Sequence, residues 1–270
     1  MQPISKSYPK ALVTGASSGL GKAFADMLLA EGVEVWGTSR DASRIEKKEG
    51  MHALSLDLAD PESVQAFMRD NVEILDQVDL FINNAGAGVF SSFFEMHPQD
   101  IGEQIKVLMH GPIALCHRVL PSMLSREKGA IVNVASLAAD FPLPWFSIYS
   151  SCKAGLSQFS RALAIELMET DVAVIDLQPG DFKTGFNHAA KKPEHMDEDE
   201  RKLWTRIEYT FTHGPEPEKA ARDLRKALLK GKSSVVRTGN FFQATLAPLF
   251  ARLVPWSLTS WSVRKYFGLR

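Results

Sequence analysis

The stretch VTGASSGLGKAF, residues 13–24, places three glycines within seven positions, after an apolar run and before a segment with helical spacing. Gly15, Gly19 and Gly21 are therefore expected in a strand-to-helix turn. Residues without side chains at such a turn let backbone N–H groups and the helix N-terminus approach a pyrophosphate. The stretch predicts a dinucleotide-binding turn, although glycines also serve as ordinary turn and packing residues.

The rest of the chain continues this alternation of short apolar runs and longer helical patterns. The runs that predict strands cover residues 11–14, 33–38, 53–56, 80–83, 130–134, 172–177 and 234–237. The helical patterns cover residues 19–31, 61–75, 98–125, 149–169 and 217–230. Asp60 before Pro61 is typical of a helix start, and Gly231 of a helix end. The alternation predicts an α/β fold, a Rossmann-like doubly wound sheet of about seven parallel strands with helices on both faces.

The composition is that of one folded domain. The 270 residues are 45% hydrophobic, and no Pro/Gly/Ser-rich linker divides them, so we predict a single domain over residues 1–270. A formal net charge of -1 provides no basic field for nucleic acid. Two cysteines are too few for a disulfide framework and fit a reducing compartment. Because no signal peptide or run of 18 apolar residues is found, we expect a cytoplasmic protein.

Four motifs follow one another along the chain. They are TGASSGLG at residues 14–21, NNAG at residues 83–86, Ser136 with Tyr149 and Lys153, and Pro179-Gly180 with Thr184. Together they resemble the motifs of the classical short-chain dehydrogenases/reductases, and the resemblance covers roughly residues 9–240. It implies an oxidoreductase that transfers a hydride between a nicotinamide cofactor and a carbonyl or secondary alcohol substrate.

The resemblance also implies which residues contact the cofactor. They are Gly15, Ser17, Ser18, Gly19, Leu20, Gly21, Ser39, Arg40, Asp57, Leu58, Asn84, Ala85, Gly86, Tyr149, Lys153, Pro179, Gly180 and Thr184.

The end of the second predicted strand distinguishes between two cofactors. An acidic residue there binds the ribose 2′-hydroxyl of NAD, whereas an arginine accommodates the 2′-phosphate of NADP. This chain has Ser39 at the usual acidic position and Arg40 next to it, which predicts NADP(H). In the alternative interpretation, Arg40 pairs with Asp41 or with solvent.

The chemistry of three residues supports hydride transfer. Tyr149 and Lys153 are four positions apart, so on a helix they share a face, where the lysine charge is expected to favour the tyrosinate. Ser136 follows a strand, at the edge of the sheet where open α/β folds place their sites. By the resemblance, Tyr149 donates a proton to the substrate oxygen, Lys153 also binds the nicotinamide ribose, and Ser136 orients the substrate.

One residue departs from the family pattern. Where the family usually has an asparagine that organises a water relay to the lysine, alignment on Gly111 and Pro121 places Leu108. Leucine cannot hydrogen-bond a water molecule. Three possibilities follow: an active enzyme with a rerouted relay, a weakened enzyme, or a cofactor-binding regulatory or scaffolding protein with little or no catalysis.

The substrate signals are weaker. Phe141, Trp145 and Phe146, near Ser136 and Tyr149, predict an apolar wall for a ketone, aldehyde or alcohol, although such aromatics also pack cores or subunit contacts.

Residues 185–215 correspond to the variable region that covers the substrate in this family. There we expect residues 196–202 to form a solvated face and Leu203 and Trp204 to contribute to the pocket.

The last residues, 245–270, are apolar and basic, and no acidic residue follows Asp223. Such a tail packs on its own domain or on a sister subunit, or it lies on a membrane surface. The resemblance further suggests a homodimer or homotetramer formed through the helices at 98–125 and 149–169. The histidines and cysteines have no metal-binding spacing, so we expect no metal site. Cys152 has no recognisable base partner and is not expected to be a nucleophile.

Overall fold

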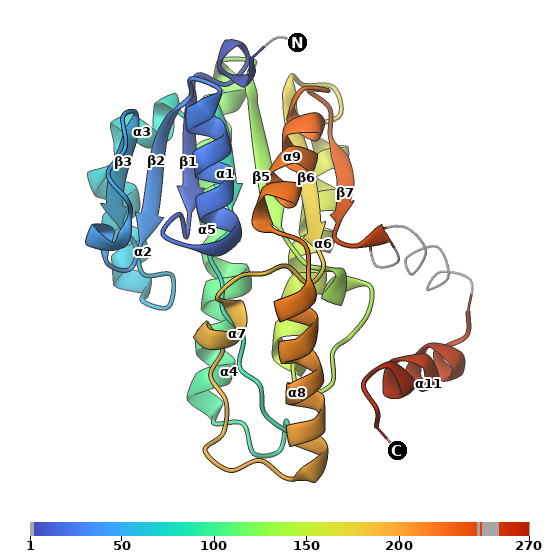
Figure 1. Cartoon of the computed structure of the whole chain (residues 1–270). Helices are drawn as coiled ribbons and strands as arrows, with labels where there is room; N and C mark the ends of the chain where they lie inside the picture. The colour runs from blue at the N-terminus through green and yellow to red at the C-terminus, as the bar shows by residue number, and fades with distance from the viewer. Residues whose placement is uncertain (1–2, 242–243, 245–253, 270) are drawn as a thin grey trace.

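A parallel β-sheet forms the centre of the molecule (Figure 1). The computed structural model describes residues 3–241, 244 and 254–269, and within these the sheet has seven strands in the order β3-β2-β1-β4-β5-β6-β7. The strands are β1 (Lys10–Thr14), β2 (Glu34–Ser39), β3 (Met51–Ser55), β4 (Leu80–Asn83), β5 (Gly129–Val134), β6 (Val172–Pro179) and β7 (Ser234–Thr238). Each neighbouring pair is parallel. The predicted doubly wound sheet is confirmed, and each predicted strand is present to within two residues at either end.

Helices cover both faces of the sheet, and each face has its own apolar core. On one face lie α1 (Gly19–Ala30) and α9 (Pro217–Leu228), whose buried residues pack on the sheet. On the other lie α2 (Pro61–Asp70), α3 (Val72–Gln77), α5 (Gly111–Ser125) and α6 (Ser147–Glu166). Beta strands covered in this way need apolar residues on both sides, which explains their nearly continuous apolar runs.

Two predicted helices are interrupted. The pattern at 61–75 divides at Asn71 into α2 and α3, because Asn71 leaves the helical conformation and its side chain donates to the Phe67 carbonyl at 2.9 Å. The pattern at 98–125 consists of α4 (Pro98–Ile105), a π-helical turn η3 (Lys106–His110) and α5. Short 3-10 turns are η1 (Ile4–Lys6), η2 (Ala42–Arg44) and η4 (Leu137–Ala139).

Among the described residues, α7 (Phe186–Ala189), α8 (Glu198–His213) and α11 (Trp256–Tyr266) lie beyond the carboxyl ends of the strands (Figure 1). The sequence analysis did not predict α8 as a helix. A capping box starts it, in which Asp197 and Glu200 each accept a hydrogen bond from the other's backbone N–H. None of the helices in the described ranges is both long and apolar enough to cross a bilayer.

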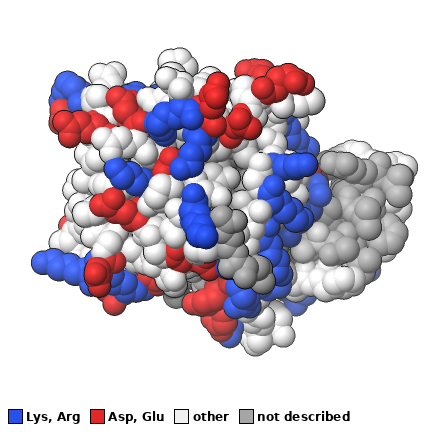
Figure 2. All heavy atoms as spheres, turned by 90° about the horizontal axis from the view of Figure 1, so that it is seen from above, with Lys and Arg blue, Asp and Glu red and all other residues white. Residues whose placement is uncertain are grey.

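Seen from the top of Figure 1, along the strands, basic and acidic side chains are interspersed over most of the main body (Figure 2). This face therefore has no extended area of one charge, except for a band of Lys and Arg to the right of its centre.

Candidate active site

The glycine turn can be built only from glycines at its tightest points. Gly15 and Gly19 have φ of 69° and 55°, in the left-handed region that favours glycine. A Cβ atom on Gly21 would lie 2.2 Å from the Gly15 carbonyl oxygen and 2.4 Å from Nδ2 of Asn84. Ser18 precedes α1 without making a side-chain cap hydrogen bond, which leaves the first N–H groups of the helix for another acceptor.

The NNAG motif is fastened to this turn. Thr14 Oγ1 accepts hydrogen bonds from the backbone N–H groups of Asn84 at 2.9 Å and Ala85 at 3.0 Å. Asn84 Nδ2 donates to the Thr14 carbonyl at 2.9 Å, so segments 70 residues apart in sequence form one unit. Asn83 points the other way and donates to Asn133 Oδ1 at 2.8 Å, which ties β4 to β5.

The end of β2 has a free basic side chain beside the turn. Ser39 is buried and its hydroxyl donates to Ser17 Oγ at 3.3 Å, whereas Arg40 is exposed. Asp41 does not pair with Arg40, because it caps η2 by accepting from Ser43 N at 2.9 Å. Within residues 3–241 and 254–269, no ion pair involves the Arg40 guanidinium.

Asp57 and Leu58 follow β3 and differ in accessibility. Asp57 Oδ1 accepts from the Ala59 backbone at 2.9 Å. Leu58 is buried and its Cδ2 atom lies 3.0 Å from where a Cβ on Gly111 would stand. Its side chain is therefore part of the core, and only its backbone is available to a ligand.

Ser136, Tyr149 and Lys153 come together at the carboxyl end of β5. Ser136 begins η4, where its Oγ accepts from Ala138 N at 3.1 Å. Tyr149 and Lys153 lie on α6, with the lysine Nζ 5.8 Å from the tyrosine ring centroid. Lys153 donates to the Val134 carbonyl at 2.7 Å, and both side chains are buried.

The electrostatics differ from the expectation that Lys153 lowers the pKa of Tyr149. Burial raises the pKa of Tyr149 to about 12, and a side-chain hydrogen bond with Ser136 opposes part of this rise. Burial also lowers the pKa of Lys153 to about 8. In the protein alone, burial is the main cause of both shifts, because it disfavours the charged form of each group.

Leu108, a residue of η3, packs against the NNAG loop. It is fully buried, and its Cδ2 atom lies 2.8 Å from where a Cβ on Gly86 would stand. Lys153 Nζ is 3.8 Å from the same point, so Leu108 and Lys153 lie close together around Gly86. A hydrocarbon side chain therefore stands where the family pattern leads one to expect a polar group.

An apolar cavity of about 550 Å³ adjoins Ser136 and Tyr149. Phe141 and Phe146 line it, as predicted from the sequence, but Trp145 does not. Trp145 instead donates through Nε1 to Glu200 at 3.0 Å.

The contribution of α8 also differs from the expectation. Leu203 and Trp204 are buried in an apolar cluster with Phe90 and do not line the cavity. One helical turn further on, Ile207, Thr210 and Phe211 line it instead.

Sequence reasoning missed the other wall of the cavity, α11. Its residues Leu258, Ser262 and Tyr266, four positions apart, line the cavity together with Val263 and the following Phe267. The only signal in the sequence was the apolar spacing of the tail, which did not identify its partner. Residues 245–253 and 270 of the predicted tail lie outside the described residues.

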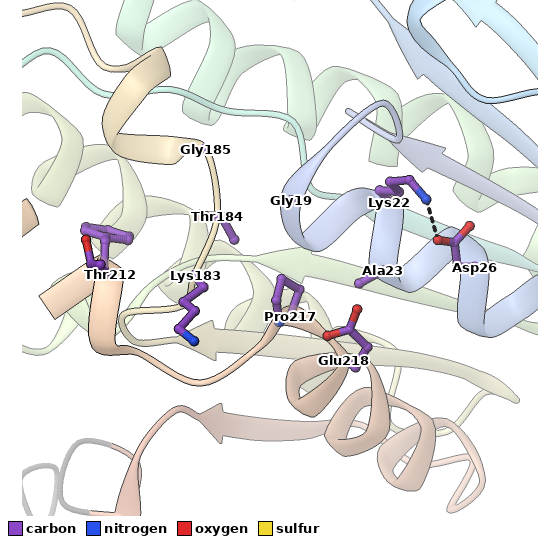
Figure 3. A pocket seen from close by; sticks show the side chains of 11 residues that line it. Gly19, Lys22, Ala23, Asp26, Lys183, Thr184, Gly185, Thr212, Pro217 and Glu218 are labelled. Carbon is purple, nitrogen blue, oxygen red and sulfur yellow. Dashed lines mark hydrogen bonds and ion pairs between the residues drawn. The ribbon is translucent and has the colours of Figure 1, made fainter.

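The cofactor candidates near the PG motif reach the same place. Leu20, Pro179, Gly180 and Thr184 line the cavity. On the outer side, Gly19 and Thr184 also border a depression of about 580 Å³ (Figure 3). Thr184 Cβ lies 3.4 Å from where a Cβ on Gly19 would stand, and Lys22 on the next turn pairs with Asp26 at 2.7 Å.

Other reactive groups are poorly placed for chemistry. Burial raises the pKa of Cys152 and, to about 12, that of Cys116, so both thiols stay protonated at neutral pH. The described ranges contain no group of three or more His, Cys, Asp or Glu suited to a metal ion.

Comparisons with known proteins match most of the chain. Residues 9–195 match the family described as short chain dehydrogenase. The chain belongs to this family. It is 30% identical to the 3-ketodihydrosphingosine reductase of Bacteroides thetaiotaomicron over 272 aligned residues, which cover 96% of this chain and 98% of the relative. It is also 30% identical to a short-chain dehydrogenase structure from Streptomyces avermitilis, with a TM-score of 0.80 and coverage of 95% and 98%.

The family uses nicotinamide cofactors, and solved structures of its fold hold either form. A serine dehydrogenase complexed with NADP⁺ has a TM-score of 0.73 at 23% identity, covering 85% of this chain and 94% of its own. A Burkholderia phymatum member in complex with NAD has a TM-score of 0.76 at 21% identity, covering 90% and 92%. The chain is thus an oxidoreductase of the short-chain dehydrogenase family acting on C=O and CH–OH groups.

Proposed function

We propose that this protein is an NADP(H)-dependent reductase of an amphipathic ketone that carries a long apolar chain. The observation that carries the proposal is the position of Ser136 and Tyr149 in the lining of a largely apolar cavity, with Lys153 beside Tyr149 on α6. A carbonyl held by Ser136 and Tyr149 would place its alkyl part against aromatic and aliphatic side chains.

The residues of the turn support the cofactor part. Gly15, Gly19 and Gly21 leave a strand-to-helix turn without side chains, next to the N-terminus of α1, and this is a suitable surface for a pyrophosphate. Arg40, exposed and without an ion pair in the described residues, would hold the 2′-phosphate of NADP. Ser39 would offer its hydroxyl there in place of the acid that binds NAD.

In the mechanism, the bound nicotinamide supplies a hydride to the carbonyl carbon. Ser136 Oγ and the Tyr149 hydroxyl orient the carbonyl oxygen, and Tyr149 donates the proton to it. With a pKa of about 12, the phenol is protonated at neutral pH, which suits the direction of reduction. Lys153, held by the Val134 carbonyl, would bind the nicotinamide ribose and stabilise the tyrosinate left after proton transfer.

The substrate class is supported by the cavity and by one relative. The Bacteroides relative is named for the reduction of 3-ketodihydrosphingosine, a long-chain ketone with an amine beside the carbonyl. In the cavity of this chain, Asp181 is the one Asp, Glu, Lys or Arg among the described lining residues. Its charge also contributes to the raised pKa of Tyr149, which indicates that the two groups interact. We assign Asp181 the role of attracting a substrate ammonium group.

The test is NADPH oxidation by the purified protein with three ketones: a long-chain 2-amino-3-ketone, the same ketone without the amine, and a short-chain amino ketone. We expect kcat/KM to be highest for the first. Asp181→Asn should raise KM for the first ketone about 10-fold or more and leave the second unchanged, since only the first carries the cation. Turnover limited to short, polar ketones would contradict the proposed substrate class.

Leu108 favours a second candidate, a cofactor-binding protein with little catalysis. Because leucine cannot anchor a relay water, proton resupply to Lys153 must take another route or be slow. The turnover of the wild type, compared with that of Leu108→Asn, distinguishes the two candidates. An unchanged rate and solvent isotope effect in an active wild type would support a rerouted relay, whereas tight NADPH binding without turnover in the wild type would support the binding protein.

Assembly through the helices at 98–125 and 149–169 is part of the same proposal. Exposed Ile105 on α4 and Ile165 on α6 support an apolar contact there. Sedimentation velocity of the wild type and Ile165→Asp checks it, with a homodimer or homotetramer expected only for the wild type.

A further inference from the structure

One face of α11 lines the cavity, and the opposite face carries exposed aromatic residues. Leu258, Ser262 and Tyr266 face the cavity, but Trp256 and Trp261 do not line it. Their side chains are 68% and 56% exposed. Two exposed tryptophans on one helix are unusual on a water-facing surface and are typical of helices that lie at a membrane interface.

Basic side chains surround this aromatic face. Arg264 and Lys265 lie on α11, and Lys265 Nζ is 5.9 Å from the Trp261 ring centroid. Arg201 and Arg206 on α8 border the groove between the two helices. Arg206 stacks over the Tyr266 ring at 5.1 Å.

The groove's acidic side chain, Glu198, is paired with Lys202 at 2.5 Å. After Asp223 the sequence has no acidic residue. The surface is thus aromatic and positively charged, with little to neutralise it from within the chain.

These features favour an anionic bilayer over a second copy of the chain. In a symmetric dimer through this face, the same positively charged patch of each copy would face the other. Anionic lipid headgroups instead match the charge, and tryptophan rings partition to the headgroup level of the bilayer. We propose that the outer face of α11, formed by Trp256, Trp261, Arg264 and Lys265, docks the protein on an anionic membrane surface.

The placement gives the docking surface a use. The helix that would lie on the membrane is also the wall of the apolar cavity, so a long-chain substrate has a short path from the bilayer to Tyr149. This use rests on the proposed function, but the docking does not, because vesicle binding is measured without cofactor or substrate.

The experiment is co-sedimentation of the full chain with vesicles of phosphatidylcholine alone and of phosphatidylcholine with 30% phosphatidylserine. We expect binding to the second only, weakened by raising the salt concentration. The double variant Arg264→Gln/Lys265→Gln should bind the anionic vesicles about 30-fold more weakly, as expected for two basic residues near the surface. Trp256→Ser/Trp261→Ser should lose binding as well.

The matched control is Phe93→Ser/Phe94→Ser, which removes two exposed aromatics from the segment before α4 and should bind like the wild type. Thermal unfolding of each variant checks its fold, and sedimentation velocity checks its oligomeric state. Equal loss of vesicle binding in the control would overturn the proposal, as would absence of binding in the wild type. Dissociation of a dimer by Trp256→Ser/Trp261→Ser, with no vesicle binding, would assign the face to a second copy instead.

Discussion

The two halves of the proposed active site, one for the cofactor and one for the substrate, are held by different means. The cofactor half is fixed by backbone geometry: Gly15 and Gly19 have left-handed φ, and Gly21 packs against a carbonyl oxygen. The substrate half is fixed by side-chain packing between α8, α11 and the segment around Phe146. A side chain cannot be added to the glycines of the cofactor half without moving the turn. In the substrate half, by contrast, side chains can be exchanged while the backbone keeps its shape. We infer that the cofactor half sets the reaction and the substrate half sets the substrate.

The largest effect should come from Tyr149→Phe, which removes the proposed acid and little else. Reduction should fall by about 10²- to 10⁴-fold, the usual contribution of a general acid. NADPH affinity, measured by fluorescence titration, should change little. Tyr209→Phe, the same change at an exposed position on α8, serves as the control. Residual turnover close to that of the wild type would remove Tyr149 from the chemistry.

Gly21→Ala tests the claim that the turn of the cofactor half cannot hold a side chain. Its Cβ would lie 2.2 Å from the Gly15 oxygen, so the turn must open, at a cost of about 1–3 kcal/mol in unfolding free energy. NADPH binding should weaken along with it. Gly102→Ala on α4, where no atom lies within 4 Å of the added Cβ, should be neutral or stabilising. Urea unfolding and NADPH titration are measured for both variants. A Gly21→Ala variant as stable and as tightly binding as the wild type would refute the claim.

Arg40→Ser examines cofactor selection within that half. If Arg40 holds the 2′-phosphate, NADPH should bind about 10- to 100-fold more weakly, as for loss of a charge-assisted hydrogen bond, while NADH is unaffected. Arg44→Ser, another exposed arginine after β2, provides the comparison. Calorimetric titration with both cofactors measures the preference. A wild type that prefers NADH would assign Arg40 to solvent.

Lys153→Met should stabilise the cofactor-free protein, even though we expect it to abolish turnover. The buried amine has a pKa of about 8 instead of 10.5, so its protonation opposes folding fully below pH 8 and not at all above 10.5. After subtracting the lost hydrogen bond to Val134, the variant should gain about 1–2 kcal/mol at pH 7. The gain should shrink as the pH rises to 10. Urea unfolding at several pH values tests this, and a gain that grows with pH has the wrong sign.

The sequence predicts the cofactor half of the structure better than the substrate half. Strands β1 to β7 could be predicted because each is an apolar run with turn residues at its ends. The glycine turn could be predicted because its constraint is local. The split at Asn71 and the π-helical η3 could not, since helical periodicity continues through both.

The substrate half resisted prediction because its contacts are tertiary. Leu203 and Trp204 are apolar residues of α8, but only the packing of the helix decides that they face Phe90 while Ile207 faces the cavity. Likewise, Trp145 has φ of 58° and turns to Glu200, which the aromatic pattern alone does not reveal. No local signal joins α11 to a cavity beside Tyr149, more than 100 residues earlier in the chain.

The most direct measurement of the central claim is deuteride transfer. The protein would be incubated with NADPH that carries deuterium at both C4 positions of the nicotinamide and with a long-chain 2-amino-3-ketone, and the product analysed by mass spectrometry. The account predicts one deuterium on the former carbonyl carbon in the wild type, with little or none in Tyr149→Phe in the same time. Reduced product without deuterium at that carbon, or labelled product formed equally fast by Tyr149→Phe, would contradict it.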